Sequence, residues 1–199
     1  HNRVRRQRQM CIRDRIKVPH QSAQDILSVY EPNAAFAELA DANTTPIDLI
    51  SVAMEQELFA DAVTFLAHAL PVRESIWWCV TCAASLQHWK EDEANAIRAA
   101  KAWVYTPDET SRRFAEQMAD KAGLETGAGW AAQAAFWSGG SMIKPEDPAV
   151  PPPPYLYAQA VAGSINLSAV LPDGEEAKER YQQFVEMGLN IASGGNGQQ

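Results

Sequence analysis

The stretch TPIDLISVAMEQELFADAVTFLAHALP, residues 45–71, carries apolar side chains at three- and four-residue spacing along most of its length. This spacing is that of one face of an α-helix, whereas a strand would alternate apolar and polar residues. Thr45 is suited to the N-cap, Pro46 to the first helical position and Asp48 to the third, which together indicate a helix start. A break near Glu55 would divide the stretch into two helices. The stretch therefore predicts an all-α fold.

The helical spacing continues through the rest of the chain. Thr106-Pro107-Asp108-Glu109 repeats the pattern of cap, proline and acid, and Gly123 is a helix stop. Short links marked by proline favour antiparallel neighbours, so we predict a single globular bundle of about seven or eight helices. A short irregular α-solenoid is the alternative, although the chain shows no period of repeat length. Besides the opening stretch, the expected helices span residues 72–89, 91–104, 107–122, 127–137, 155–171 and 175–193.

The two ends of the chain differ from this helical part. Residues 5–15, RRQRQMCIRDR, correspond residue by residue to the in-frame translation of a transposon adapter used in sequencing libraries. We therefore expect residues 1–15 to be a non-native, disordered extension. Residues 16–44 should form an N-terminal segment with short helices, residues 45–193 the helical domain, and residues 194–199 a disordered tail.

Charge and composition limit the classes of function. The whole chain has a formal net charge of −8, and without the six Arg and one Asp of residues 1–15 the remaining eleven basic and 24 acidic residues give about −13. Such an acidic surface repels the phosphate backbone, which argues against nucleic-acid binding. No apolar run reaches the roughly 18 residues of a spanning helix, so we expect no membrane insertion. Two remaining cysteines form no disulfide framework, which favours a reducing, cytoplasmic location.

The sequence WWCVTC places Cys79 and Cys82 directly after two tryptophans. Trp before Cys-x-x-Cys is typical of thiol redox sites, which need a low-pKa thiolate at a helix N-terminus. Here the helix begins near Pro71, so Cys79 lies mid-helix and the helix dipole acts weakly on it. We therefore expect two buried core residues rather than a redox pair. His68 and His88 could complete a metal site with them, but the spacing matches no closed zinc pattern, and we expect no metal and no other cofactor.

A tryptophan followed by a glycine-rich turn and a proline-rich loop is the best candidate for a binding surface. The loop, MIKPEDPAVPPPP, holds six of the twelve prolines, and its last four should adopt polyproline II. Trp137 could anchor a partner at this loop, or it could pack over the prolines of its own chain. The candidate protein-binding residues are Arg73, Trp137, Ser138, Gly139, Gly140, Ser141, Pro152, Pro153 and Tyr155.

No carboxylate pair, Ser-His-Asp set or di-iron spacing stands out along the chain. We therefore expect a non-enzymatic protein whose partner is another protein of unknown identity. One alternative is an enzyme or small-ligand protein with a pocket near Arg73, Glu74 and the tryptophans. A second alternative is a thiol redox protein that uses Cys79 and Cys82.

Four segments carry a resemblance to a known family: DAVTFLAHALPVRESIWWCVTCA, AAKAWVYTPDETSRRFAEQMA, AAFWSGGSM and VPPPPYLYAQAVAGSINLSAV. Together they resemble an uncharacterised bacterial domain-of-unknown-function family of small, Ala-rich, all-helical proteins, over roughly residues 45–193. The chain departs from that family at Cys79, where an alanine is expected, which argues further against a Cys-x-x-Cys function. The resemblance implies no particular activity. It does imply a link to bacterial secretion gene clusters, among them type VI, and so an accessory or adaptor role.

Overall fold

The computed structural model describes residues 17–87 and 89–198. Residues 1–15, expected to be adapter-derived, lie outside the described residues, as do the candidate metal ligand His88 and Gln199. The described part of the chain contains ten α-helices and no strand. The helices are α2 (Ala23–Leu27), α3 (Ala34–Ala37), α4 (Pro46–Glu55), α5 (Phe59–Ala69), α6 (Val72–Ala84), α7 (Glu91–Tyr105), α8 (Glu109–Ala122), α9 (Gly127–Phe136), α10 (Leu156–Ala169) and α11 (Ala177–Ala192).

The predicted all-α fold is confirmed, and two features raise the helix number above seven or eight. The first is that the short helices α2 and α3 form as separate elements. The second is the break after Glu55, where Glu57 adopts a positive φ of 59°. The backbone N–H of Leu58 then donates to the carbonyl of Ala53 (2.9 Å), which ends α4 and redirects the chain into α5.

The helix starts follow local side-chain chemistry, with one correction. Thr45 caps α4 as expected, because its hydroxyl accepts from the backbone N–H of Asp48 (3.3 Å). The similar pattern at Thr106 predicted the next cap two residues too early. Thr106 ends α7, and Asp108 caps α8 by accepting from the backbone N–H of Ser111 (2.7 Å). A carboxylate at this position also meets the positive end of the helix dipole, which favours Asp108.

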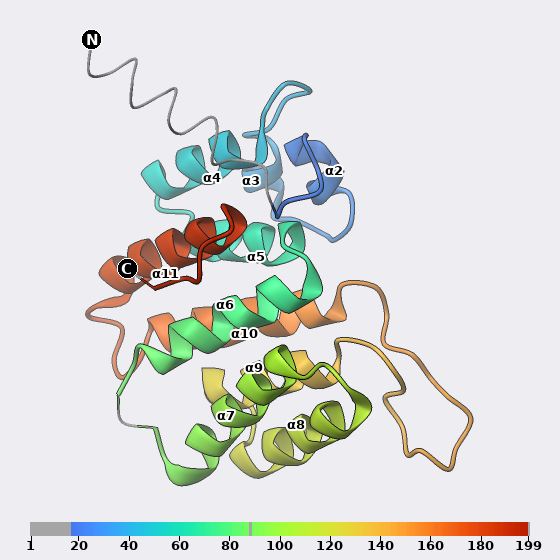
Figure 1. Cartoon of the computed structure of the whole chain (residues 1–199). Helices are drawn as coiled ribbons and strands as arrows, with labels where there is room; N and C mark the ends of the chain where they lie inside the picture. The colour runs from blue at the N-terminus through green and yellow to red at the C-terminus, as the bar shows by residue number, and fades with distance from the viewer. Residues whose placement is uncertain (1–16, 88, 199) are drawn as a thin grey trace.

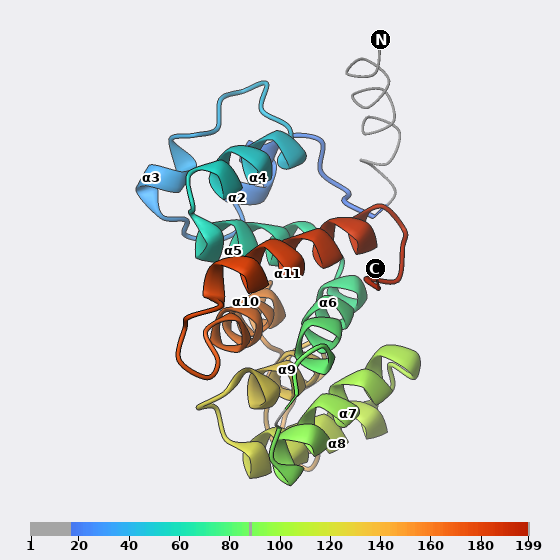
Figure 2. The same ribbon diagram turned by 90° about the vertical axis from the view of Figure 1, so that its left-hand side faces the viewer.

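Helix α10 lies at the centre of the molecule and contacts α5, α6, α9 and α11. Figure 1 shows α2–α4 stacked on α5 and α11, then α6 and α10, with α7–α9 at the far end, and Figure 2 keeps this order. Because helices distant in sequence meet at α10, the fold is a bundle and not the alternative solenoid, whose units contact only their neighbours. Alanines and Gly127 allow the close approach of α9 to α10, where the Ser164 hydroxyl donates to the Gly127 carbonyl (2.7 Å).

Both flanking segments are attached to the bundle. In the N-terminal segment, Ile26 and Phe36 are fully buried, and the Phe36 ring lies 5.8 Å from that of Phe65 on α5. Residues 194–198, expected to belong to the tail, have a contact with the bundle. The Trp77 indole N–H donates to the Asn196 carbonyl (2.9 Å), which holds this segment against α6. Sequence reasoning missed this because the contact joins residues more than a hundred positions apart.

None of the helices in the described part of the chain combines the length and the apolar character needed to cross a membrane. The longest, α11, has 16 residues and buries one face against α5, α6 and α10. Its other face carries charged and polar side chains, which is the pattern of a helix at the surface of a bundle.

Candidate functional site

Residues 138–154, which we call the arm, connect α9 to α10 and contain the predicted glycine-rich turn and proline run. Figure 1 shows the arm reaching beyond the ends of the neighbouring helices. It is closed on itself, because the backbone N–H of Met142 donates to the Val150 carbonyl (2.8 Å). The Ser141 hydroxyl accepts from the N–H groups of Ile143 (3.3 Å) and Val150 (3.1 Å). The arm is therefore a folded protrusion with defined geometry.

Arg112 on α8 fixes the base of the arm. Its guanidinium is buried and donates to the carbonyls of Phe136 (2.8 Å) and Ser141 (2.9 Å), on either side of the glycine pair. Gly140 has a φ of 66°, and a Cβ there would lie 2.8 Å from the guanidinium, so glycine is needed both for its conformation and for space. A buried charge-assisted network of this kind is costly to break.

Two further side chains of α8 complete this anchor. Arg113 donates to the carbonyl of Ile143 in the arm (2.6 Å). Glu109 pairs with both arginines, at 2.6 Å from Arg112 and 2.9 Å from Arg113. Hydrogen bonds from Arg112, and then from Arg113, lower the pKa of the Glu109 carboxyl to about 2. Glu109 thus remains ionised at neutral pH, and the Arg112 charge is neutralised where it is buried.

Several predicted residues of this region face the protein interior. Trp137 is half-buried, packs against the core and stands edge-on to Trp130 with ring centroids 6.2 Å apart. The Ser138 hydroxyl donates to the carbonyl of Ala135 (2.7 Å), a backbone acceptor at the C-terminal end of α9. Tyr155 has a positive φ of 62° and packs against the core.

The outer part of the arm is exposed. Pro153 is exposed, Gly139 and Pro152 are partly exposed, and the exposed apolar side chains are Ile143 and Val150, at 36% and 43%. Large apolar side chains at the surface of a protrusion are a feature of contact sites for other proteins. Ile143 and Val150 were not among the predicted residues, because the sequence does not show which side of the loop faces outward.

Arg73 lies elsewhere in the fold. Its Nε donates to the carbonyl of Val104 at the end of α7 (2.7 Å). Among the described residues, no hydrogen bond, ion pair or ring contact joins Arg73 to the arm. Arg73 instead lines an open cleft of about 250 Å³ together with Glu74 and Trp77. Of the residues predicted for a ligand pocket, the cleft brings together Arg73, Glu74 and Trp77 but none of the other tryptophans. Arg73 is separated from the other candidate protein-binding residues.

A second open cleft, of about 350 Å³, continues along α6 on the other side of Trp77, and it is lined in part by Thr81 and by Lys101 of α7. We call the two clefts together the α6 groove. The residues 194–198, which we call the tail, cross the groove at Trp77, and Figure 2 shows the chain turning back from α11 toward α6. The side chain of Asn190 accepts from the Gly197 N–H (2.9 Å) and so fixes the tail to α11.

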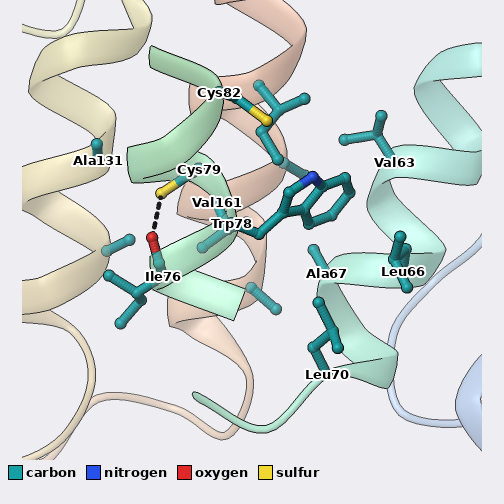
Figure 3. Packing of buried hydrophobic residues seen from close by; sticks show 14 of the residues in the cluster. Val63, Leu66, Ala67, Leu70, Ile76, Trp78, Cys79, Cys82, Ala131 and Val161 are labelled. Carbon is teal, nitrogen blue, oxygen red and sulfur yellow. Dashed lines mark hydrogen bonds between the residues drawn. The ribbon is translucent and has the colours of Figure 1, made fainter. Parts of the chain in front are cut away.

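Cys79 and Cys82 are free thiols inside the core. The Cys79 thiol contacts the Ile76 carbonyl (3.2 Å), and Figure 3 shows it among buried apolar side chains. Burial raises the pKa of Cys79 to about 12 and raises that of Cys82 well above its usual value. Both thiols are therefore held protonated at neutral pH, which opposes the thiolate chemistry of the redox alternative.

His68 on α5 lies in an aromatic cluster between the N-terminal segment and the start of α10. Its ring stacks on Tyr30 at 4.2 Å and lies 5.9 Å from Tyr155. Its Nδ1 contacts the Thr64 carbonyl (2.7 Å), whereas Nε2 is buried and has no partner among the described residues. Burial lowers the pKa of the imidazole. His68 therefore acts as a neutral core histidine, and no cluster of three potential metal ligands occurs within residues 17–87 and 89–198.

The chain belongs to DUF6931, a family of unknown function, whose model matches residues 49–192. The match contains all four segments on which the resemblance rests, and the predicted membership of an uncharacterised family is confirmed. No curated protein and no solved structure matches the chain.

Proposed function

We propose that this member of the DUF6931 family is a non-enzymatic accessory or adaptor protein that binds another protein through the outer side of the arm. The observation that carries the proposal is the geometry of the arm. It holds exposed apolar side chains and a proline run on a protrusion whose base is tied to a buried arginine, Arg112.

The fixed shape of the arm favours binding for an energetic reason. A flexible loop must be ordered on association, and this ordering subtracts from the affinity. Here the contacts of Arg112, Arg113 and Ser141 order the arm before any partner arrives. The prolines 151–154 have little conformational freedom to lose, and a polyproline segment presents its carbonyls and apolar rings to a partner.

We further propose that the protein acts in the bacterial cytoplasm, with a component of a secretion system as its partner. The free, buried state of Cys79 and Cys82 supports a reducing compartment. The family resemblance is the basis for the secretion system, so its components are the first partners to test.

The test uses two matched double variants. Ile143→Ser/Val150→Ser removes the exposed apolar side chains of the arm. Val52→Ser/Val170→Ser removes two valines elsewhere on the surface whose exposures of 36% and 41% match those of Ile143 and Val150. Wild-type protein and both variants are immobilised, exposed to extract of the source cells, and the retained proteins are quantified by mass spectrometry.

The proposal predicts at least one protein that wild type and Val52→Ser/Val170→Ser retain equally and that Ile143→Ser/Val150→Ser loses by about tenfold or more. Circular dichroism confirms that each variant is folded. Equal retention by all three proteins would show that the arm is not the contact surface.

A further inference from the structure

We propose that the α6 groove is a second binding site, which takes an extended peptide segment bearing carboxylate side chains. This inference goes beyond the arm, because none of the residues that line the groove belongs to the arm. Four features of the groove support it: its length, its charge, its main-chain donor and the tail that already crosses it.

The length of the groove follows from one stripe of α6. Arg73, Trp77, Thr81 and Ala84 recur at three- and four-residue spacing and so lie on one face of the helix. The eleven steps from Arg73 to Ala84 span about 16 Å at the helical rise. An extended chain advances by about 3.3 Å per residue, so the groove can hold about five residues of an extended peptide.

The walls of the groove come from α7 and from α11. Lys101, Val104 and Tyr105 line it from α7, and Met187 and Ile191 line it from α11. Because α7 and α11 lie on either side of this stripe of α6, side chains border the groove along its length. A peptide there would contact apolar walls and would still be open to solvent on one side, as in other grooves that bind extended segments.

The groove is basic in an otherwise acidic chain. The full sequence has a net charge of −8. Of the described residues that line the groove, Lys17, Arg73 and Lys101 are cationic and Glu74 alone is acidic. Glu74 is already neutralised by Lys17 at 2.9 Å. The surplus positive charge favours a carboxylate-bearing occupant and disfavours a basic one.

Arg73 is the side chain of the groove that is best placed to donate hydrogen bonds to a carboxylate. Its Nε is committed to the Val104 carbonyl (2.7 Å), which fixes the plane of the guanidinium. Its two Nη atoms have no partner among the described residues, and the side chain is exposed. A guanidinium held in this way can offer the paired N–H groups that bind a carboxylate in two-point geometry.

Trp77 supplies the contact to a peptide main chain. Its indole N–H donates to the carbonyl of Asn196, so a main-chain carbonyl of the tail already occupies this position. The ring of Tyr105, 64% exposed, stands edge-on to Trp77 at 5.8 Å and forms an aromatic wall beside that position. A partner peptide would replace the tail on Trp77, with the glycines Gly194 and Gly195 providing the hinge.

The probe for this site is a fluorescein-labelled peptide of alternating Glu and Pro, with a peptide of alternating Gln and Pro as its uncharged match. Binding to the full chain is followed by fluorescence anisotropy at low salt. Arg73→Gln is compared with Arg98→Gln, which removes the same charge from an exposed position of α7 outside the groove. Both variants keep the N-terminal arginines, so their comparison cancels non-specific attraction to those residues.

The Glu-Pro peptide should bind more tightly than the Gln-Pro peptide, and Arg73→Gln should weaken its binding by about fivefold relative to Arg98→Gln. Lys101→Gln, which leaves the contact between Arg73 and Val104 intact, should weaken it in the same direction. Equal binding of the two peptides, or equal binding by the variants of Arg73 and Arg98, would overturn the proposal.

Two further measurements define the occupant. Removal of residues 196–199 should tighten peptide binding, because the competing carbonyl of Asn196 leaves Trp77. Weaker binding after this removal would overturn the proposal that peptide and tail share the same position. Competition by free glutamate at the concentration of the peptide would also overturn it, since the groove would then be a site for small anions. Loss of arm-dependent retention, by contrast, bears only on the proposed function.

Discussion

The substitution Gly127→Ala tests the closest helix contact of the bundle. Gly127 begins α9, and a Cβ added there would lie 2.3 Å from the carbonyl oxygen of Ser164 and 2.2 Å from the hydroxyl of Ser168, both on α10. Carbon–oxygen contacts of this kind are ordinarily no shorter than about 3.4 Å. One of the two obstacles is backbone, so side-chain rotation cannot relieve the clash, and α9 must move away from α10 by about 1 Å.

The expected cost follows from this displacement. Overpacking of a well-packed interior costs about 1–3 kcal/mol, and separation also weakens the 2.7 Å hydrogen bond from the Ser164 hydroxyl to the Gly127 carbonyl, worth about 1 kcal/mol. The gain from replacing glycine in a helix is at most about 1 kcal/mol and smaller at the first residue. We expect a net loss of about 2 kcal/mol in the free energy of unfolding, which corresponds to a drop in Tm of about 4–8 °C for a chain of this size.

Thermal unfolding followed by far-ultraviolet circular dichroism measures this loss, and Gly163→Ala is the matched control. Gly163 lies in the middle of α10, and a Cβ there would be 3.5 Å from the Trp130 ring, an ordinary contact. Gly163→Ala should therefore leave Tm unchanged or raise it. If Gly127→Ala is as stable as Gly163→Ala, α9 and α10 do not approach as closely as the structure has them, and the reasoning is refuted.

Two more predictions follow from the buried titratable groups. In the native protein a thiol-titrating reagent at neutral pH should report no thiol beyond Cys11, because burial raises the pKa of Cys79 and Cys82. A reaction of Cys79 or Cys82 before the protein unfolds would contradict their burial. Burial lowers the pKa of His68, so the folded state binds a proton at this imidazole less readily than the unfolded state does. The free energy of unfolding should therefore be highest above about pH 6.5 and should fall as the pH drops toward the lowered pKa. Urea midpoints measured across this range should fall less steeply for His68→Phe, and an unchanged pH profile would count against His68 as the cause.

Local chemistry was enough to predict the helices. The break after Glu55 and the cap at Thr45 depend on residues within one or two turns of each other, and the structure has both. The position of Cys79 in the middle of its helix followed from its distance along the chain to Pro71, where that helix begins. The cap at Thr106 was predicted wrongly, because the pattern there repeats that of Thr45, whereas the structure uses Asp108 as the cap.

Contacts between distant helices were beyond the reach of the same reasoning. Arg112 and Arg113 are adjacent, and nothing in the sequence distinguishes them, yet Arg112 is buried because α8 turns that face toward α9 and the arm. The α6 groove likewise joins Arg73, Tyr105 and Ile191, which are widely separated along the chain.

The sequence by itself determined that the described part of this protein is helical, where most helices begin and end, and that Cys79 lies mid-helix. These properties arise from backbone hydrogen bonds and side-chain spacing within a few residues. Only the tertiary structure decided which arginine anchors the arm, which side chains the arm exposes, and that the tail crosses the groove at Trp77. Those outcomes depend on how each helix is rotated against its neighbours, and that rotation is set by packing across the whole core.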